Sequence, residues 1–170
     1  MLKPEISTLI NEQINKELFS SYLYLNISNY YTYKNLSGFA NWFNVQAQEE
    51  LAHANFFIQY LQDNGEAVSL KSIEADSTVF ENFIDPLNYT LQHEQSVTAS
   101  IENIYALALE KKDFRTTQFL DWFIKEQAEE EKNADDLIKK FELFAIDGKG
   151  LYLLDTELAA RTFVPPTLTI

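Results

Sequence analysis

The sequence contains no cysteine among its 170 residues, which excludes disulfides and thiolate metal sites. Glycine and proline number only four each, and no stretch is low in complexity, so little of the chain is expected to be disordered. No segment approaches the roughly 18 unbroken apolar residues that a membrane helix needs, and no basic region precedes an apolar run at the N-terminus. We therefore expect a cytoplasmic protein with no membrane partner.

Positive charge is also scarce, since 13 Lys and Arg residues stand against 26 Asp and Glu residues, which gives a net charge of −13. A surface of this sign repels a phosphate backbone, so nucleic acid is not an expected partner. The charge is compatible with attracting cations, although acidity alone is weak evidence for a site. The placement of the acids within the chain is more informative.

Helix-breaking residues are few and divide the chain into long blocks. Pro4 and Pro86 suit the first turn of a helix, Gly65 follows the end of one, and Asp113 is a capping residue. We predict one domain over residues 1–170, with helices at 4–33, 36–64, 86–112, 114–141 and 150–161.

The lengths of the connections predict how the helices are arranged. Short links at 34–37 and 112–113 make their flanking helices antiparallel neighbours, whereas the long link over 65–84 can cross the length of a bundle. The second and third helices would then run parallel. The predicted fold class is all-α: a four-helix bundle with one long crossover and a short fifth helix at the C-terminal end.

Each long helix carries a carboxylate within its own apolar stripe, near mid-length. At the helical period of 3.6, these inward acids are Glu17, Glu50, Glu94 and Glu130. Burying a carboxylate costs several kcal/mol, and four converging anions also repel one another. The few cations near these stripes fall on other faces, so a divalent metal is the expected source of positive charge.

The spacing of Glu50 and His53 places a carboxylate and an imidazole one helical turn apart, where they can grip one metal ion. Alone this motif is common by chance, but the acids on the other three helices strengthen it. Oxygen ligands with a single imidazole suit iron or manganese better than copper, and zinc could also bind.

At these residues the sequence resembles the ferritin family, specifically the bacterial non-haem ferritins. Ferritin-like di-iron bundles use Glu from two helices and Glu-x-x-His from two others. Here Gln127-Ala-Glu-Glu130 replaces the second Glu-x-x-His, and non-haem ferritins characteristically lack that second histidine. The stretches that carry the resemblance are Asn11–Glu17, Gln48–His53, Glu126–Glu131 and Gly150–Asp155.

The resemblance implies a role for each site residue. Glu17, Glu50 and His53 would hold one iron, and Glu50 would bridge to a second iron held by Glu94 and Glu130. A third iron would be held beside the pair, and two further residues would contact the centre or an oxygen species. The third-site residues are Glu49, Glu126 and Glu129, with Glu130, and the contacting residues are Tyr24 and Gln127.

The implied function is iron storage with ferroxidase activity. Ferrous iron would be oxidised by dioxygen or hydrogen peroxide and kept as ferric mineral in a homo-oligomeric cage of 24 subunits. Haem bound through methionine is not expected, because Met1 is the only methionine. Two alternatives stay open at this point, namely another di-iron enzyme of the same fold and a purely structural bundle; a miniature ferritin fits poorly because of the fifth helix.

Overall fold

The computed structural model describes residues 2–168, most of which lie in five α-helices. These are α1 (Pro4–Tyr33), α2 (Ser37–Asp63), α3 (Asp85–Glu110), α4 (Phe114–Phe144) and α5 (Gly148–Leu158). Residues 2–168 contain no strand, so the predicted all-α class is confirmed. None of the helices within this range is both long and apolar enough to cross a membrane.

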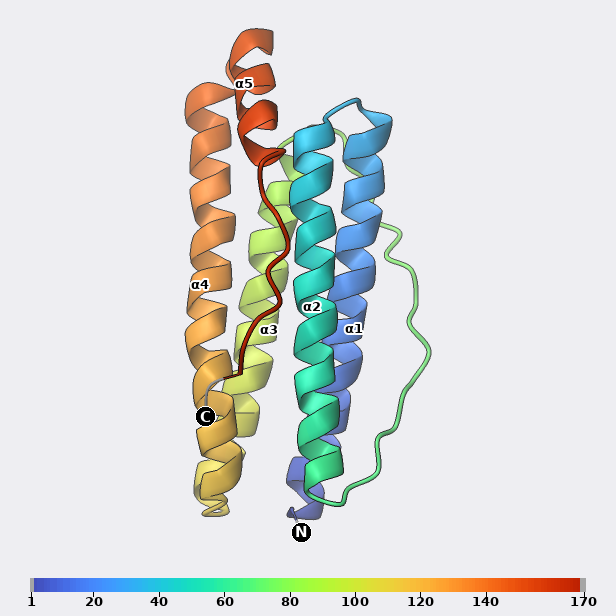
Figure 1. Ribbon diagram of the computed structural model, residues 1–170, viewed down its shortest axis with the longest axis vertical. Helices are drawn as coiled ribbons and strands as arrows, with labels where there is room; N and C mark the ends of the chain where they lie inside the picture. Colours follow the sequence, from blue (N-terminus) through green and yellow to red (C-terminus); the bar gives the residue numbers. More distant parts are fainter. Residues whose placement is uncertain (1, 169–170) are drawn as a thin grey trace.

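The long helices form two antiparallel pairs, α1 with α2 and α3 with α4, and α5 lies at one end of the bundle (Figure 1). The connection over residues 64–84 runs outside α1 along the length of the bundle. This crossover makes α2 and α3 parallel, as its length predicted. At 30 residues, α1 is about 45 Å long.

The crossover is fastened to α1 by two asparagine side chains. The amide of Asn11 donates to the Ala67 carbonyl at 3.1 Å and accepts from the Ser69 N–H at 2.7 Å. One turn later, Asn15 donates to the Ser69 carbonyl at 3.0 Å and accepts from the Lys71 N–H at 2.7 Å. These amides satisfy backbone groups that a neighbouring strand would otherwise satisfy, so the segment stays ordered without a sheet.

The observed helix bounds differ from the predicted ones mainly around α5. α4 continues to Phe144 rather than 141, and α5 begins at Gly148 rather than 150. Asp147 accepts a hydrogen bond from the Gly150 N–H at 2.7 Å, so it caps α5 and draws both glycines into the first turn.

α5 is attached to the beginning of α2 by a carboxylate. Oδ1 of Asp155 accepts from the backbone N–H groups of Gly38 at 2.8 Å and Phe39 at 3.0 Å, where α2 has no capping side chain of its own. A Cβ added at Gly38 would lie 1.6 Å from the carbonyl oxygen of Asp155. Only glycine therefore allows the two helices to approach this closely.

The core consists of two apolar clusters separated along the bundle axis. One surrounds Phe39 and Phe43 near α5, and the other surrounds Phe57 and Phe123 toward the opposite end. On every long helix, the inward acid lies between residues of the first cluster and residues of the second. The bundle therefore has a polar layer at mid-length, where an apolar core would otherwise be continuous.

Candidate metal centre

The four inward acids meet in this polar layer. Glu17, Glu50, Glu94 and Glu130 project from α1, α2, α3 and α4 respectively, and each is at most 5% exposed. The 3.6-residue period places each acid on the buried stripe of its helix, so the same pattern that builds the core also buries the charge. The geometry of the layer decides what it can bind.

Three of the predicted ligands form one compact group. Glu17, Glu50 and His53 each offer an atom within 4.8 Å of the others, and all three are buried. Nδ1 of His53 lies 3.4 Å from Oε2 of Glu50, as expected for residues one helical turn apart. Two carboxylates and an imidazole at this separation are a suitable ligand set for a divalent transition metal.

Two atoms of this group are buried without a hydrogen-bond partner among the described residues. They are Oε2 of Glu17 and Nε2 of His53. An unsatisfied buried polar atom costs about 1–3 kcal/mol, and more if it is charged. A metal ion held by this group would satisfy Oε2 of Glu17, whereas Nε2 of His53 lies on the side of the ring that faces Glu126. The donor set therefore fits iron.

A second group shares His53 and extends toward α4. His53, Glu126 and Glu130 also offer atoms within 4.8 Å of one another. Glu126 is the least buried member, with its side chain 27% exposed, and its Oε1 lies 4.0 Å from Nε2 of His53. The imidazole therefore lies between a fully buried group and one that opens toward solvent.

Glu94 belongs to neither group, and its carboxylate is held by two neighbours. The hydroxyl of Tyr24 donates to Oε1 of Glu94, and Nε2 of Gln127 donates to Oε2 at 3.2 Å. Gln127 also lies 3.3 Å from the Thr98 hydroxyl. Tyr24 and Gln127 thus contact an acid of the centre, and both are buried.

Burial dominates the electrostatics of the layer. The pKa values of Glu17, Glu50 and Glu130 are raised well above the usual range, first by burial and then by a neighbouring carboxylate. For Glu17 that neighbour is Glu50, and for Glu130 it is chiefly Glu94. Burial also raises the pKa of Glu94, while hydrogen bonds from Tyr24 and Gln127 act in the opposite direction.

The three acids of the implied third site are more exposed than the inward four. Burial raises the pKa of Glu126 and of Glu49. Nη2 of Arg161 lies 2.5 Å from Oε2 of Glu49, and Glu129 is exposed on α4. The structure does not bring Glu49 or Glu129 into either ligand group.

Aromatic and imidazole side chains surround the centre. The indole of Trp122 meets His53 edge-on, with ring centroids 5.6 Å apart, and so restricts the orientation of the imidazole. His93 belongs to neither ligand group, and its Nε2 lies 2.7 Å from the hydroxyl of Ser20. Burial lowers the pKa of His93 to about 4, so this imidazole is neutral near pH 7.

Comparisons with known proteins identify the family of the chain. Residues 7–144 match the model of the family described as "Ferritin-like domain". The chain belongs to the ferritin family of iron-storage proteins. The bacterial non-heme ferritin of Escherichia coli O6:H1 is 36% identical to it, over 94% of this chain and 96% of that protein. The corresponding Staphylococcus haemolyticus protein is also 36% identical, over 96% of this chain and 98% of its own length.

Solved ferritin structures superimpose on this chain over almost its whole length. The open pore ferritin of the archaeon Archaeoglobus fulgidus is 35% identical, with a TM-score of 0.92, over 95% of this chain and 98% of that chain. An engineered closed form of the same ferritin gives a TM-score of 0.94, with 35% identity over 96% of this chain and 100% of that chain. The predicted ferritin-like bundle with a short fifth helix is confirmed.

In this ferritin chain, two glutamines that support the acids were not identified from the sequence. Nε2 of Gln13 donates to Oε1 of Glu17 at 2.7 Å, and Nε2 of Gln46 donates to Oε2 of Glu130 at 2.6 Å and to Oε1 of Glu50 at 3.3 Å. Each glutamine precedes the acid of its own helix by four residues. That spacing on one helix face was the signal that could have revealed them.

Proposed function

We propose that this chain is a ferroxidase subunit that oxidises ferrous iron at the polar layer and stores the ferric product. The observation that carries the proposal is the group of Glu17, Glu50 and His53, three buried side chains with ligand atoms within 4.8 Å of one another, in which Oε2 of Glu17 and Nε2 of His53 have no hydrogen-bond partner among the described residues. A bundle that kept its acids for structural reasons alone would pair or cap those atoms. Iron here is the substrate.

The acids are suited to bind two ferrous ions at once. Glu17, Glu50 and His53 would hold one ion, and Glu50 would bridge to a second held by Glu94 and Glu130. Glu94 accepts hydrogen bonds from Tyr24 and Gln127, and Glu130 accepts one from Gln46. Each of these acids retains lone pairs for a metal, because a carboxylate accepts at about four positions.

The redox step balances with a two-electron oxidant. Each of two ferrous ions gives up one electron, and together they reduce dioxygen to hydrogen peroxide, or hydrogen peroxide to water, with two protons taken up. Carboxylates are hard ligands that accommodate both oxidation states of iron. Because the centre holds no thiolate and one imidazole, ferric iron can leave it for the mineral. A third ion at Glu49, Glu126 and Glu129, with Glu130, would lie on the side of the centre that opens toward solvent.

Storage requires an enclosed space, and we propose that the chain forms a homo-oligomeric cage of 24 subunits in the cytoplasm. Several large apolar side chains are exposed around α5, among them Leu143, Ile146, Tyr152 and Leu153. Leu154 and Leu158 pack inward and fix α5 on the bundle, which leaves the outer apolar face available for another subunit. Elution as a monomer or dimer from a sizing column would contradict the cage.

The ferroxidase proposal is tested by adding dioxygen to anaerobic protein loaded with ferrous iron. The wild type should oxidise iron much faster than buffer and keep it in solution. Glu50→Ala should reduce the rate to that of buffer, while Glu102→Ala, which removes an exposed acid of α3, should leave it unchanged. If the wild type does no better than Glu50→Ala, the proposal fails.

A further inference from the structure

Arg161 lies in the segment that follows α5 and returns along the bundle beside α2 (Figure 1). Its guanidinium stacks on the indole of Trp42, with Cζ 4.5 Å from the ring centroid. Its backbone carbonyl accepts a hydrogen bond from Nδ2 of Asn41 at 2.9 Å. The residue is therefore fixed at both its backbone and its side chain.

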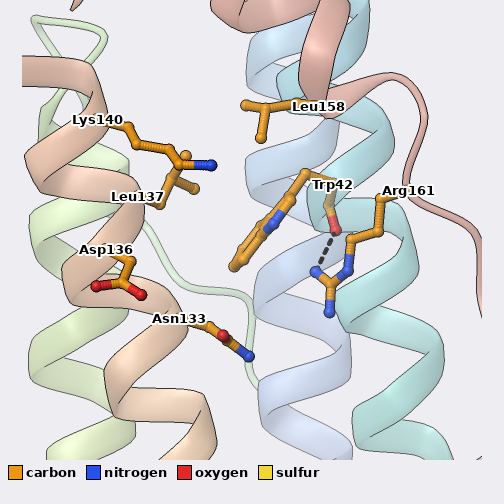
Figure 2. A pocket seen from close by; sticks show the side chains of 7 residues that line it. All are labelled: Trp42, Asn133, Asp136, Leu137, Lys140, Leu158 and Arg161. Atoms are coloured by element: carbon orange, nitrogen blue, oxygen red, sulfur yellow. Dashed lines mark hydrogen bonds between the residues drawn. The ribbon is translucent and has the colours of Figure 1, made fainter.

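The guanidinium of Arg161 donates three hydrogen bonds to α2. Nη1 contacts the Trp42 carbonyl at 3.2 Å, drawn in Figure 2, and Oε1 of Gln46 at 3.0 Å. Nη2 contacts Oε2 of Glu49 at 2.5 Å. A guanidinium is planar, permanently charged and only a donor, so it can hold an amide oxygen and a carboxylate at the same time.

The contact with Gln46 determines which way that amide points. Because its oxygen accepts from Arg161, its Nε2 is directed at Glu130 and Glu50, to which it donates. The reverse orientation would place the amide oxygen against two carboxylates and the amide hydrogens against a cation. Arg161 thus acts through Gln46 on two acids of the proposed iron pair.

The contact with Glu49 has a different effect. Glu49 is 21% exposed and already has a cation within contact distance. A metal ion that binds Glu49 must displace the guanidinium or share the carboxylate with it, and the positive charge of Arg161 opposes its approach. The inner acids have no such competitor, since His53 is the only basic side chain among the described residues that forms an ion-pair contact with one of them.

We propose that Arg161 is a positioning residue that favours filling of the centre by two metal ions over filling by three. The inference rests on the proposed function. By fixing the Gln46 amide, Arg161 keeps Glu50 and Glu130 arranged for the inner pair. By occupying Glu49, it weakens binding of a third ion outside that pair.

The test is a calorimetric titration of metal-free protein with Zn²⁺, which is not oxidised and so reports binding without turnover. The measured quantity is the affinity for the first two ions divided by the affinity for the third. Arg161→Gln should lower this ratio about 10-fold or more, because loss of a residue that orients metal ligands typically costs 10–100-fold in affinity. Arg161→Lys keeps the positive charge but loses the planar guanidinium that contacts Gln46 and Glu49 together. Its affinity ratio should therefore lie between those of Arg161→Gln and the wild type.

Lys140→Gln is the matched control. Lys140 lines the same cleft as Arg161 (Figure 2), and it pairs with Glu157 at 2.6 Å. Its replacement removes one positive charge from this region without contacting Gln46 or Glu49, so the ratio should stay at the wild-type value. Thermal unfolding of each metal-free variant would verify that the bundle is intact.

A ratio for Arg161→Gln within about threefold of wild type would overturn the inference, as would an equal fall in Lys140→Gln. Neither result touches the proposed function, provided that wild type binds two ions tightly and Glu50→Ala does not. If wild type itself binds no ion more tightly than Glu50→Ala, the proposed function fails instead.

Discussion

The inward acids and the acids beside them carry the same functional group in opposite surroundings. Glu17, Glu50, Glu94 and Glu130 are buried, and their charge is supported mainly by amides and a hydroxyl. Glu49, in contrast, lies partly in solvent with Arg161 against it. Glu126 is half-buried and Glu129 is exposed.

The difference shows which acids need a metal. A solvated or arginine-paired carboxylate is stable by itself, whereas a buried carboxylate supported by neutral donors stays costly while it is charged. The inward acids, when charged, are therefore unfavourable in the metal-free protein, and binding of a cation relieves that cost. The outer acids are more exposed, and Glu49 has a cation beside it, so their charge costs less in the absence of iron.

The largest predicted effect is on the rate of iron oxidation, and it is measured by comparing two single variants on α4, one from the inward set and one from the outer set. Glu130→Ala should slow iron oxidation by about 100-fold or more, because it deletes a ligand of the inner pair. Glu129→Ala should change the initial rate by less than about threefold, since that acid is exposed. Stopped-flow absorbance at equal protein and iron concentrations measures both rates. Equal losses in the two variants would remove the distinction between the sets.

The second prediction concerns the pH dependence of the metal-free protein. Burial and Glu94 raise the pKa of Glu50, so between its unfolded value, about 4.3, and its folded value the folded state binds more protons than the unfolded state. The free energy of unfolding should therefore fall as pH rises through this window. Glu50→Gln removes the titration and should be more stable than wild type at pH 8, by about 2 kcal/mol.

Denaturant unfolding in the presence of a chelator, at several pH values, measures this effect. The advantage of Glu50→Gln should vanish below pH 4, where the wild-type carboxyl is protonated as well. Glu129→Gln is the control from the outer set, and its stability should follow that of wild type at every pH. A wild-type protein that became more stable between pH 5 and pH 8 would contradict the prediction.

A smaller effect is expected from the amides that support the inward acids. Gln13→Leu leaves Oε1 of Glu17 without its donor, and we expect about 10-fold weaker binding of Zn²⁺ to the inner pair. Titration calorimetry measures the loss. An affinity equal to that of wild type would mean that Glu17 is oriented by its helix alone.

The smallest effect is predicted for Lys16, the α1 counterpart of Arg161. Nζ of Lys16 reaches Gln13 only through the hydroxyl of Ser100, at 2.6 Å and then 2.7 Å, and Lys16 is exposed. Solvent screens such a charge, so Lys16→Gln should alter Zn²⁺ affinity by less than about twofold. If Lys16→Gln changed Zn²⁺ binding as much as Arg161→Gln, an exposed cation would influence the metal ligands as strongly as the more buried Arg161.

Much of the fold could be predicted from the sequence because the helix-breaking residues are few and well separated. The end of α2, the beginning of α3 and the parallel course of these two helices followed from Gly65, Pro86 and the length of the crossover. The details around α5 did not follow. Asp155 accepts from the N–H of Gly38, which lies 117 residues earlier in the chain, a contact that no local pattern indicates.

The centre was predictable to the extent that it depends on helical periodicity. Each inward acid and His53 lies on one stripe of its own helix, and the period of 3.6 fixes that face. Arg161 was not predictable, because it meets Glu49 across 112 residues of sequence. The absence of Glu94 from both ligand groups depends on hydrogen bonds between different helices, which a single-helix pattern does not contain.

The position of Arg161 after α5 has a consequence for biosynthesis. Translation produces every residue of the four long helices, and thus all the inward acids, before it produces this arginine. The ion pair between Arg161 and Glu49 therefore depends on a residue that is made after all four long helices. Glu49 is thus the acid beside the centre whose cation is supplied last in synthesis, by a segment that lies outside the five helices.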